Sequence, residues 1–406
     1  MPIPSRAQIA ATLAPIGGTN TITGTAMAPR TTLMLRSCVL AAIASASVFA
    51  ACRSEGDAMG KTNIEWATDV WNPIRGCSRV SEGCRNCYAE RMAIRQASPG
   101  IDSEEARDGQ YKGKPSAYHG LVKSTPAGPR WTGEVRLVEE LLVKPLRLRS
   151  PRRIFVNSMS DLFHEKVSNE AIAAIFGVMI FANQHVFQIL TKRAARMCDW
   201  FAWLLHASPS IMPELRGETQ RATCWKAMER FGVEWDGRWC GSQWPLPHVW
   251  LGVSVEDQAT ADERIPLLLE TPAAVRWVSY EPALGPVTFS QAEQLDWIVV
   301  GGESGPGARP FYVSWARSVL RQCRAAGVPA FVKQLGANVI DRNDNFGFDG
   351  WDETTWPYRV EHRVEHDIHG YREEYQGADC RIRLIDRKGG DPAEWPADLR
   401  VREFPT

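Results

Sequence analysis

Between residues 153 and 334, short hydrophobic runs alternate with longer segments in which hydrophobic and polar positions recur at helical spacing. The runs are rich in Val, Ile, Phe and Trp, and each ends in polar residues, which is typical of buried strands. Six strands are predicted: Arg153 to Met159, His185 to Thr191, Val249 to Val255, Val275 to Tyr280, Asp296 to Gly301 and Pro329 to Gln334. Helices are predicted over residues 169–182, 194–205, 257–269 and 314–326, and Gly327 ends the last of them.

The strict alternation of strand and helix predicts right-handed crossovers and a parallel sheet. Two weaker candidates, Val70 to Trp71 and Gly133 to Val138, raise the number of strands to between six and eight. We therefore expect an α/β protein with a complete or partial (β/α) barrel of the TIM type, in which the strands are parallel. A doubly wound open sheet is the alternative.

The first 58 residues differ in composition from the rest of the chain. They are rich in Ala, Thr, Ser and Pro, contain four Arg and two acidic residues, and show no amphipathic period. The stretch from Met34 to Cys52 imitates a lipoprotein export signal, but more than thirty residues precede it. We interpret residues 1–58 as a non-native or disordered extension, with export as the alternative. Residues 59–336 are then the barrel, with a Trp-rich insertion at about 206–247, and residues 337–406 form a charged C-terminal extension.

Composition narrows the class of protein. The chain has 406 residues, of which 44% are hydrophobic, and its 47 Lys and Arg balance 47 Asp and Glu. These values exclude a disordered chain, a collagen-like chain and a dedicated basic nucleic-acid wrapper. Ten cysteines are too few for a disulfide scaffold, so we expect a reducing, cytoplasmic compartment. The apolar run between Met34 and Cys52 is too short and too rich in Ala for a stable transmembrane helix, so we expect no association with a membrane.

Polar residues follow the predicted strands at the point where each strand ends. They are Asn157, Ser158, Asp161, Thr191, Lys192, Arg193, Ser254, Glu256, Asp257, Glu281, Gly301, Gly302, Glu303, Ser304, Lys333 and Gln334. The carboxyl ends of parallel strands form the active face in barrels and in open sheets alike. Each residue alone is equally consistent with a helix cap, a turn or an ion pair. Together they predict a pocket.

Three cysteines lie close together in the loop from Trp71 to Ala89. Cys77, Cys84 and Cys87 have the spacing C-x6-C-x2-C. Structural zinc sites and electron-transfer clusters use four ligands, and the nearest further candidates are His119 and Cys198. Three cysteines on one loop suit a [4Fe-4S] cluster with one iron left open. A zinc site completed by a distant residue and three unligated thiols are the alternatives.

A three-cysteine loop early in a (β/α) barrel resembles the radical S-adenosylmethionine superfamily. There, three cysteines hold a [4Fe-4S] cluster, and the amino and carboxylate groups of S-adenosylmethionine chelate the remaining iron. The chain resembles an uncharacterised phage-associated family more closely, through WNPIRGCSRVSEGCRNCYAERMA, RRIFVNSMSDLFHE, FQILTKR, VWLGVSVEDQ, VSYEPALGP, WIVVGGESGPGARP and FVKQLG, between about Lys61 and Gly336. The superfamily's usual spacing is C-x3-C-x2-C with an aromatic residue where Asn86 stands, and its Gly-Gly-Glu element comes earlier than Gly301 to Glu303 do here.

The resemblance implies an enzyme that generates a 5'-deoxyadenosyl radical to modify a nucleotide, a nucleic acid or a peptide. Under it, Cys77, Cys84 and Cys87 are the metal ligands. The candidates for binding S-adenosylmethionine are Gly301, Gly302, Glu303, Asn157, Ser158 and Glu256. The candidates for catalysis are Glu303, Lys192, Glu281 and Lys333. The expected partner is a reductase or a defence-system protein, and the alternative function is a zinc-stabilised, non-catalytic phage or defence-associated interaction protein.

Seven of the sixteen tryptophans lie between residues 194 and 250, interspersed with Arg and Lys. Such a segment is able to stack the bases of a nucleic acid. The interpretation we prefer is a small satellite core that stabilises a long insertion.

Overall fold

The structure is a computed structural model, and it describes residues 60–62, 64–97, 117–208, 216–234, 244–343, 360–363 and 378–405. The predicted extension over residues 1–58 and part of the predicted insertion at 206–247 lie outside the described residues. The limits of these segments therefore stay predictions.

The central sheet of the described part contains seven parallel strands: β2 (Asp69–Trp71), β7 (Arg153–Val156), β8 (Val186–Thr191), β9 (Val249–Val255), β10 (Val275–Tyr280), β11 (Trp297–Gly301) and β13 (Ala330–Gln334). A short strand, β1 (Gly60–Lys61), pairs antiparallel with β2. The strands lie in chain order, whereas the order of a doubly wound sheet reverses. No pairing joins β13 to β1 or β2 among these residues, so the sheet is a partial (β/α) barrel, as predicted.

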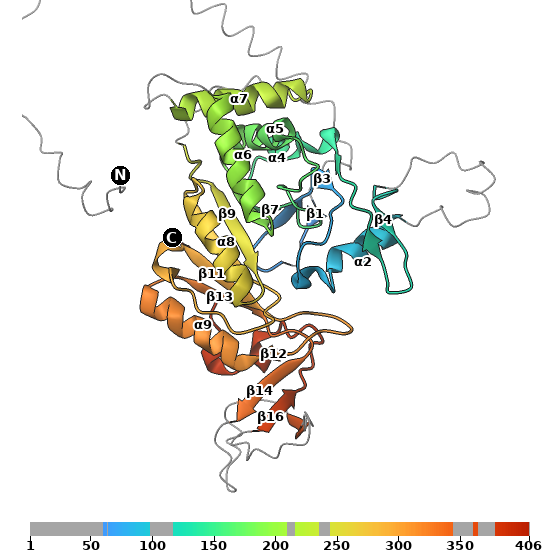
Figure 1. Ribbon diagram of the computed structural model, residues 1–406, viewed down its shortest axis with the longest axis vertical. Helices are drawn as coiled ribbons and strands as arrows, with labels where there is room; N and C mark the ends of the chain where they lie inside the picture. Colours follow the sequence, from blue (N-terminus) through green and yellow to red (C-terminus); the bar gives the residue numbers. More distant parts are fainter. Residues whose placement is uncertain are drawn as a thin grey trace, which may run out of the picture. The chain divides into compact units, whose positions relative to one another are not determined.

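Helices connect the strands. They are α2 (Tyr88–Ala97), α4 (Lys144–Arg147), α5 (Asn169–Phe181), α6 (Ala194–Ala207), α7 (Arg216–Arg230), α8 (Gln258–Glu270) and α9 (Val313–Ala326). Figure 1 shows α6, α8 and α9 along one side of the sheet and α2 on the other. The ends follow local signals: the Ser168 hydroxyl accepts a hydrogen bond from the Ala171 amide at the start of α5, and Gly327 ends α9 with a φ of 68°. The four predicted helices are confirmed to within two residues at each end.

The smaller sheets lie outside the barrel. They pair β3 (Ile74–Arg75) with β6 (Arg136–Leu137), β4 (Val122–Lys123) with β5 (Arg130–Trp131), and β12 (Phe311–Tyr312) with β14 (Val339–Asn343), β16 (Ala378–Ile382) and β15 (Val360–Arg363). The prediction of a barrel strand over residues 133–138 is therefore wrong. The physical reason is that none of these residues is buried, whereas a central parallel strand is covered on both faces.

The two faces of the central strands carry different side chains. The outward face contributes aliphatic residues such as Ile154, Val253 and Val332 to the core beneath the helices. The inward face contributes aromatic residues, among them Trp277 and Phe331. Trp66, from the segment before β2, closes this interior, with its ring 4.7 Å from Phe155 and 5.4 Å from Trp277. The half-barrel thus has a floor of buried aromatic side chains, although its strands are uniform hydrophobic runs in the sequence.

The C-terminal residues cover the open edge of the sheet. Arg402 forms an antiparallel bridge with Phe331 on β13, and the Val332 amide donates to the Val401 carbonyl at 2.9 Å. Phe404 stacks on Trp297 with the ring centroids 5.5 Å apart. An edge whose amides and carbonyls are paired in this way is protected from pairing with another chain.

Tryptophans of the Trp-rich segment between residues 194 and 250 pack into the protein where the structure describes them. Trp200 is fully buried and stacks on Phe176 at 4.5 Å, and Trp244 lies 6.4 Å from the same ring. Trp235 and Trp239 lie outside the described residues. No helix in the described part of the chain is long and apolar enough to cross a membrane.

Candidate functional site

A cavity of about 2270 Å³ opens at the carboxyl ends of the central strands. Most of the residues predicted from the sequence line it: Cys77, Cys84, Cys87, Asn157, Ser158, Lys192, Glu281, Gly302, Glu303 and Lys333. Two predicted residues, Gly301 and Glu256, are not among its lining residues. The strand-end residues and the cysteine loop therefore meet at one place, as the polar strand ends indicated.

The polar lining continues the inward face of the barrel. On β10, Trp277 belongs to the aromatic floor and Ser279 lines the cavity, as does Glu281 directly after the strand. On β13, Phe331 belongs to the floor and Lys333 to the lining. Alternate residues of a strand point to the same face. On each of these strands, the inward side chain is therefore aromatic at one position and polar two residues later.

The cysteine loop is anchored to four other parts of the chain. The contacts are Arg79 Nε to Glu90 Oε1 of α2 (3.1 Å), Arg193 Nη2 after β8 to Ser78 Oγ (2.8 Å), Ser81 Oγ to Glu256 Oε1 after β9 (3.1 Å), and Asn86 Nδ2 to Glu303 Oε2 after β11 (2.9 Å). Because these anchors involve charged or amide groups with little exposure, the loop has a defined position over the strand ends.

Burial makes the thiols of Cys77 and Cys87 poor acids in the folded protein. Burial and the nearby Asp161 carboxylate raise the pKa of Cys77 to about 12, although the Arg193 guanidinium opposes this with Nη1 3.9 Å from Sγ. Burial also raises the pKa of Cys87. A metal must therefore displace protons to bind these sulfurs. Within the described ranges, no group of three His, Cys, Asp or Glu side chains is arranged to hold a single metal ion.

The two residues considered as a fourth ligand do not join the cysteines. His119 is exposed, and the Cys198 thiol donates to the Leu267 carbonyl at 3.0 Å. Neither lines the cavity.

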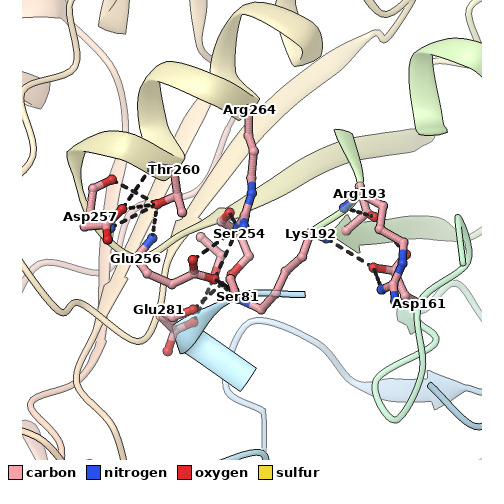
Figure 2. Close-up of polar contacts among 12 residues, drawn as sticks. Ser81, Asp161, Lys192, Arg193, Ser254, Glu256, Asp257, Thr260, Arg264 and Glu281 are labelled. Carbon is pink, nitrogen blue, oxygen red and sulfur yellow. Dashed lines mark hydrogen bonds and ion pairs between the residues drawn. The ribbon is translucent and has the colours of Figure 1, made fainter. Parts of the chain in front are cut away.

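Glu256 is held within a buried charge network (Figure 2). Its carboxylate accepts hydrogen bonds from Lys192 Nζ and from Arg264 Nη1, the latter at 3.1 Å, and its side chain is 1% exposed. Lys192 Nζ also donates to Ser254 Oγ at 2.6 Å. A Cβ at Gly83 would lie 2.5 Å from Glu256 Oε1, so glycine is needed where the cysteine loop crosses this carboxylate. The structure thus gives Glu256 an internal role, and its predicted role in binding a cofactor stays a prediction.

A second network joins β8 to the segment after β7 (Figure 2). Arg193 Nη1 donates to Asp161 Oδ2 at 3.1 Å, and Arg193 Nε donates to Glu165 Oε1 at 2.8 Å. The Thr191 hydroxyl donates to Asp161 Oδ1 at 2.7 Å. Arg193 is therefore committed to carboxylates and to the cysteine loop.

Glu303 is also occupied by residues of the chain. Arg309 Nη2 donates to Oε1 at 2.8 Å, and Arg309 Nε and Asn86 Nδ2 donate to Oε2. Burial alone would raise the pKa of Glu303, but the hydrogen bonds from Arg309 and Asn86 outweigh it and hold this pKa below its usual value. The preceding glycines have packing reasons: a Cβ at Gly301 would lie 2.5 Å from Glu281 Oε1, and one at Gly302 would meet the Leu335 carbonyl.

Glu281 and Lys333 form a pair on the cavity wall. Lys333 Nζ lies 3.0 Å from Glu281 Oε1, and Ser279 Oγ donates to Glu281 Oε2 at 3.1 Å. The side chains are 25% and 13% exposed for Lys333 and Glu281, so both remain within reach of a bound molecule.

Asn157 carries an unpartnered buried donor. Its Oδ1 accepts from the Ile74 amide at 3.3 Å, but its Nδ2 has no hydrogen-bond partner among the described residues, although the residue is 3% exposed. Its φ is 57°, an uncommon left-handed conformation for a residue other than glycine. Buried polar groups are almost always paired, and strained backbone concentrates at functional sites. A ligand in the cavity that Asn157 lines would supply the missing acceptor.

Sequence reasoning missed several residues of this site. His164 is buried, with Nε2 2.9 Å from Ser78 Oγ, and burial together with the Arg193 charge lowers its pKa. Tyr88 donates its hydroxyl to the Ser158 carbonyl, and residues 381–388 line the mouth. The sequence signal that could have indicated His164 was its position in the segment after a predicted strand. No local pattern indicated that residues 381–388 approach the barrel.

Fold and site together define an α/β protein with a partial (β/α) barrel, in which a three-cysteine loop lies over a polar cavity at the strand ends. The match to a family model is consistent with this: residues 61–378 match the family described as protein of unknown function (DUF5131). The chain belongs to this family. No curated protein and no solved structure matches the chain significantly.

Proposed function

We propose that this protein is a radical S-adenosylmethionine-type [4Fe-4S] enzyme. One observation carries the proposal: Cys77, Cys84 and Cys87, from a single anchored loop, line the same cavity as strand-end polar groups of the barrel. No fourth cysteine lines this cavity in the described part of the chain. A cluster held by three thiolates keeps one iron open for a bound molecule, which is the donor arrangement that the resemblance implies.

The donor chemistry of three thiols on one loop suits such a group. When bound, the cluster would supply an electron that cleaves S-adenosylmethionine to a 5'-deoxyadenosyl radical. Cys77, Cys84 and Cys87 would bind iron as thiolates. Arg193, 3.9 Å from the Cys77 sulfur, would offset part of the negative charge that these ligands carry.

Polar groups on the cavity wall would orient the cofactor. Asn157 Nδ2 would donate to an acceptor such as a carboxylate or a ribose hydroxyl. Lys333 and Glu281 would face the carboxylate and the ammonium of the methionyl moiety, because the pair presents one charge of each sign. Depth in the barrel mouth would keep bulk water away from the reacting atoms.

The substrate class that we propose is a nucleotide, a nucleic acid or a peptide. The electron would come from a low-potential reductase, and the protein would act in the reducing cytoplasm. A phage or defence context is part of the same proposal, because the resemblance from which it comes is to phage-associated proteins.

Anaerobic reconstitution of the full chain with iron and sulfide tests the metal centre. We expect a brown protein with about four iron atoms per chain, and loss of the chromophore in Cys84→Ala. Cys198→Ser is the matched control, because this thiol lies outside the cavity and bonds to Leu267 and Thr271, contacts that a hydroxyl keeps. A colourless protein with one stoichiometric zinc would support the alternative, a zinc-stabilised interaction protein, and would overturn the proposal.

A further inference from the structure

Positive charge gathers at the cavity of a chain that is neutral overall. Among the described residues, eleven Lys and Arg line the cavity, compared with six Asp and Glu. The formal net charge of the whole chain is zero, so this excess of cations is local. Cavities lined by one sign of charge attract ligands of the opposite sign.

The inner cations and the outer ones differ in their partners. Lys192, Arg193 and Lys333, at the strand ends, are each paired with a carboxylate. Five outer cations make no ion pair with another described residue: Arg91, Arg95, Arg381, Arg387 and Lys388. A sixth lining cation, Arg75, also makes none, but it donates to the Ala117 carbonyl at 3.4 Å. Asp386 and Asp391 line the cavity as well, but the lining cations without an ion-pair partner among the described residues are mainly these outer ones, whereas the strand-end cations are paired.

Large apolar side chains lie among these outer cations. Tyr88 is 46% exposed, Met92 42% and Ile385 71%, and all three line the cavity. On α2, the spacing places Tyr88, Arg91, Met92 and Arg95 on one helical face. Alternating cations and flat or apolar side chains are the pattern with which proteins hold the phosphates and bases of a single strand.

We propose that the mouth binds a single-stranded nucleic acid, with phosphates on the five outer cations and one base inside the cavity. This inference rests on the proposed function for its chemistry, but the binding surface is independent of any cluster. A base within a duplex is stacked and does not reach the strand ends of a barrel, so a single strand or an extruded base is the geometry that fits. The two groups of cations come from separate elements, α2 and β16 with the loop after it, and an oligomer has several phosphates with which to contact both.

The number of outer cations sets the expected salt dependence. Each phosphate neutralised on a single strand contributes about −0.7 to the slope of log K against log salt concentration. Five contacts give a slope of about −3.5, and removal of two should reduce its magnitude by about 1.4.

Fluorescence anisotropy of the full chain, without iron, tests the proposal. The probe is a labelled mixed-sequence 12-nucleotide DNA or RNA, titrated between 50 and 200 mM salt. We expect micromolar binding in low salt, at least tenfold weaker binding by Arg387→Gln/Lys388→Gln or by Arg91→Gln/Arg95→Gln, and the smaller slope for both. Arg321→Gln/Arg324→Gln on α9 is the control, since these exposed arginines do not line the cavity.

Three results would overturn the proposal: no binding of either oligomer, tighter binding of the matching duplex, or equal binding of poly-glutamate or inorganic phosphate. An equal loss of affinity in the α9 control variant would also overturn the proposal, because the positive charge of the protein would then promote binding wherever it lies. The assay uses protein without a cluster, so its failure leaves the iron-sulfur assignment standing, and failure of the iron-sulfur assignment leaves this assay interpretable.

Discussion

Replacement of Glu256 by Gln separates an internal role for this residue from a role in binding a cofactor. Glu256 faces two cations, Lys192 and Arg264, and also accepts from Ser81 of the cysteine loop. The side chain of Glu256 is 1% exposed and that of Arg264 is 4% exposed, so solvent does not replace a lost charge there. Gln keeps the volume of the side chain and removes the charge.

The expected magnitude follows from this burial. Removal of one partner from a buried ion pair costs about 3–5 kcal/mol, because the other charge is left without compensation. The side chain of Lys192 is 21% exposed, which places the loss at the lower end of that range. We expect a decrease of about 3 kcal/mol in the free energy of unfolding, which corresponds to a decrease in Tm of roughly 6–12 °C.

Urea denaturation and calorimetry of the full chain measure this effect. Glu134→Gln is the matched control, because Glu134 pairs with Lys166 at the surface with side chains 61% and 51% exposed, and such pairs contribute at most about 1 kcal/mol. Stability of Glu256→Gln within 1 kcal/mol of wild type, together with weakened S-adenosylmethionine binding, would refute the internal role and restore the role in cofactor binding.

Three further predictions follow from the same contacts. Gly83→Ala places a Cβ 2.5 Å from Glu256 Oε1, so overpacking should cost about 1–3 kcal/mol and lower the iron content after reconstitution; unchanged Tm and iron content would count against the close approach. Glu303 has a lowered pKa in the folded protein, so its contribution to stability is present above about pH 4.5 and is lost as the pH falls below this value. Glu303→Gln should therefore flatten the acid limb of a plot of Tm against pH. An unaltered acid limb would contradict this prediction. Asn157→Asp keeps the acceptor for the Ile74 amide and removes the donor that has no described partner. Calorimetric titration of the reconstituted protein should show at least tenfold weaker S-adenosylmethionine binding, with Tm changed by only a few degrees. Unchanged affinity would show that Nδ2 donates to no ligand.

Most of the barrel could be predicted because its signals are local. The run from Val249 to Val255 and the run from Val275 to Tyr280 coincide with β9 and β10, since buried parallel strands are continuous apolar runs between polar ends. Residues 133–138 gave a similar but weaker pattern and pair elsewhere, because alternation alone does not specify a partner strand. The aromatic floor could not be predicted, because it depends on the register between paired strands. That register places Trp277 beside Trp297.

The location of the candidate site could be predicted, but the partners of its side chains could not. The rule that strand ends converge placed Lys192, Glu281 and Lys333 at the cavity. It did not show that Glu303 is occupied by Arg309 and Asn86, because those contacts depend on how two loops fold over the strand ends. Likewise, Arg387 lies more than fifty residues after the last barrel strand, and only tertiary packing brings it to the mouth.

The most direct test of the central claim is the formation of 5'-deoxyadenosine by the reconstituted full chain. The anaerobic protein is incubated with S-adenosylmethionine and dithionite, and the products are separated by chromatography with mass detection. The account predicts 5'-deoxyadenosine that requires dithionite, is absent in Cys77→Ala, Cys84→Ala and Cys87→Ala, and persists in Cys198→Ser. A fully loaded cluster that yields no 5'-deoxyadenosine, or a product that survives loss of these cysteines, would contradict it.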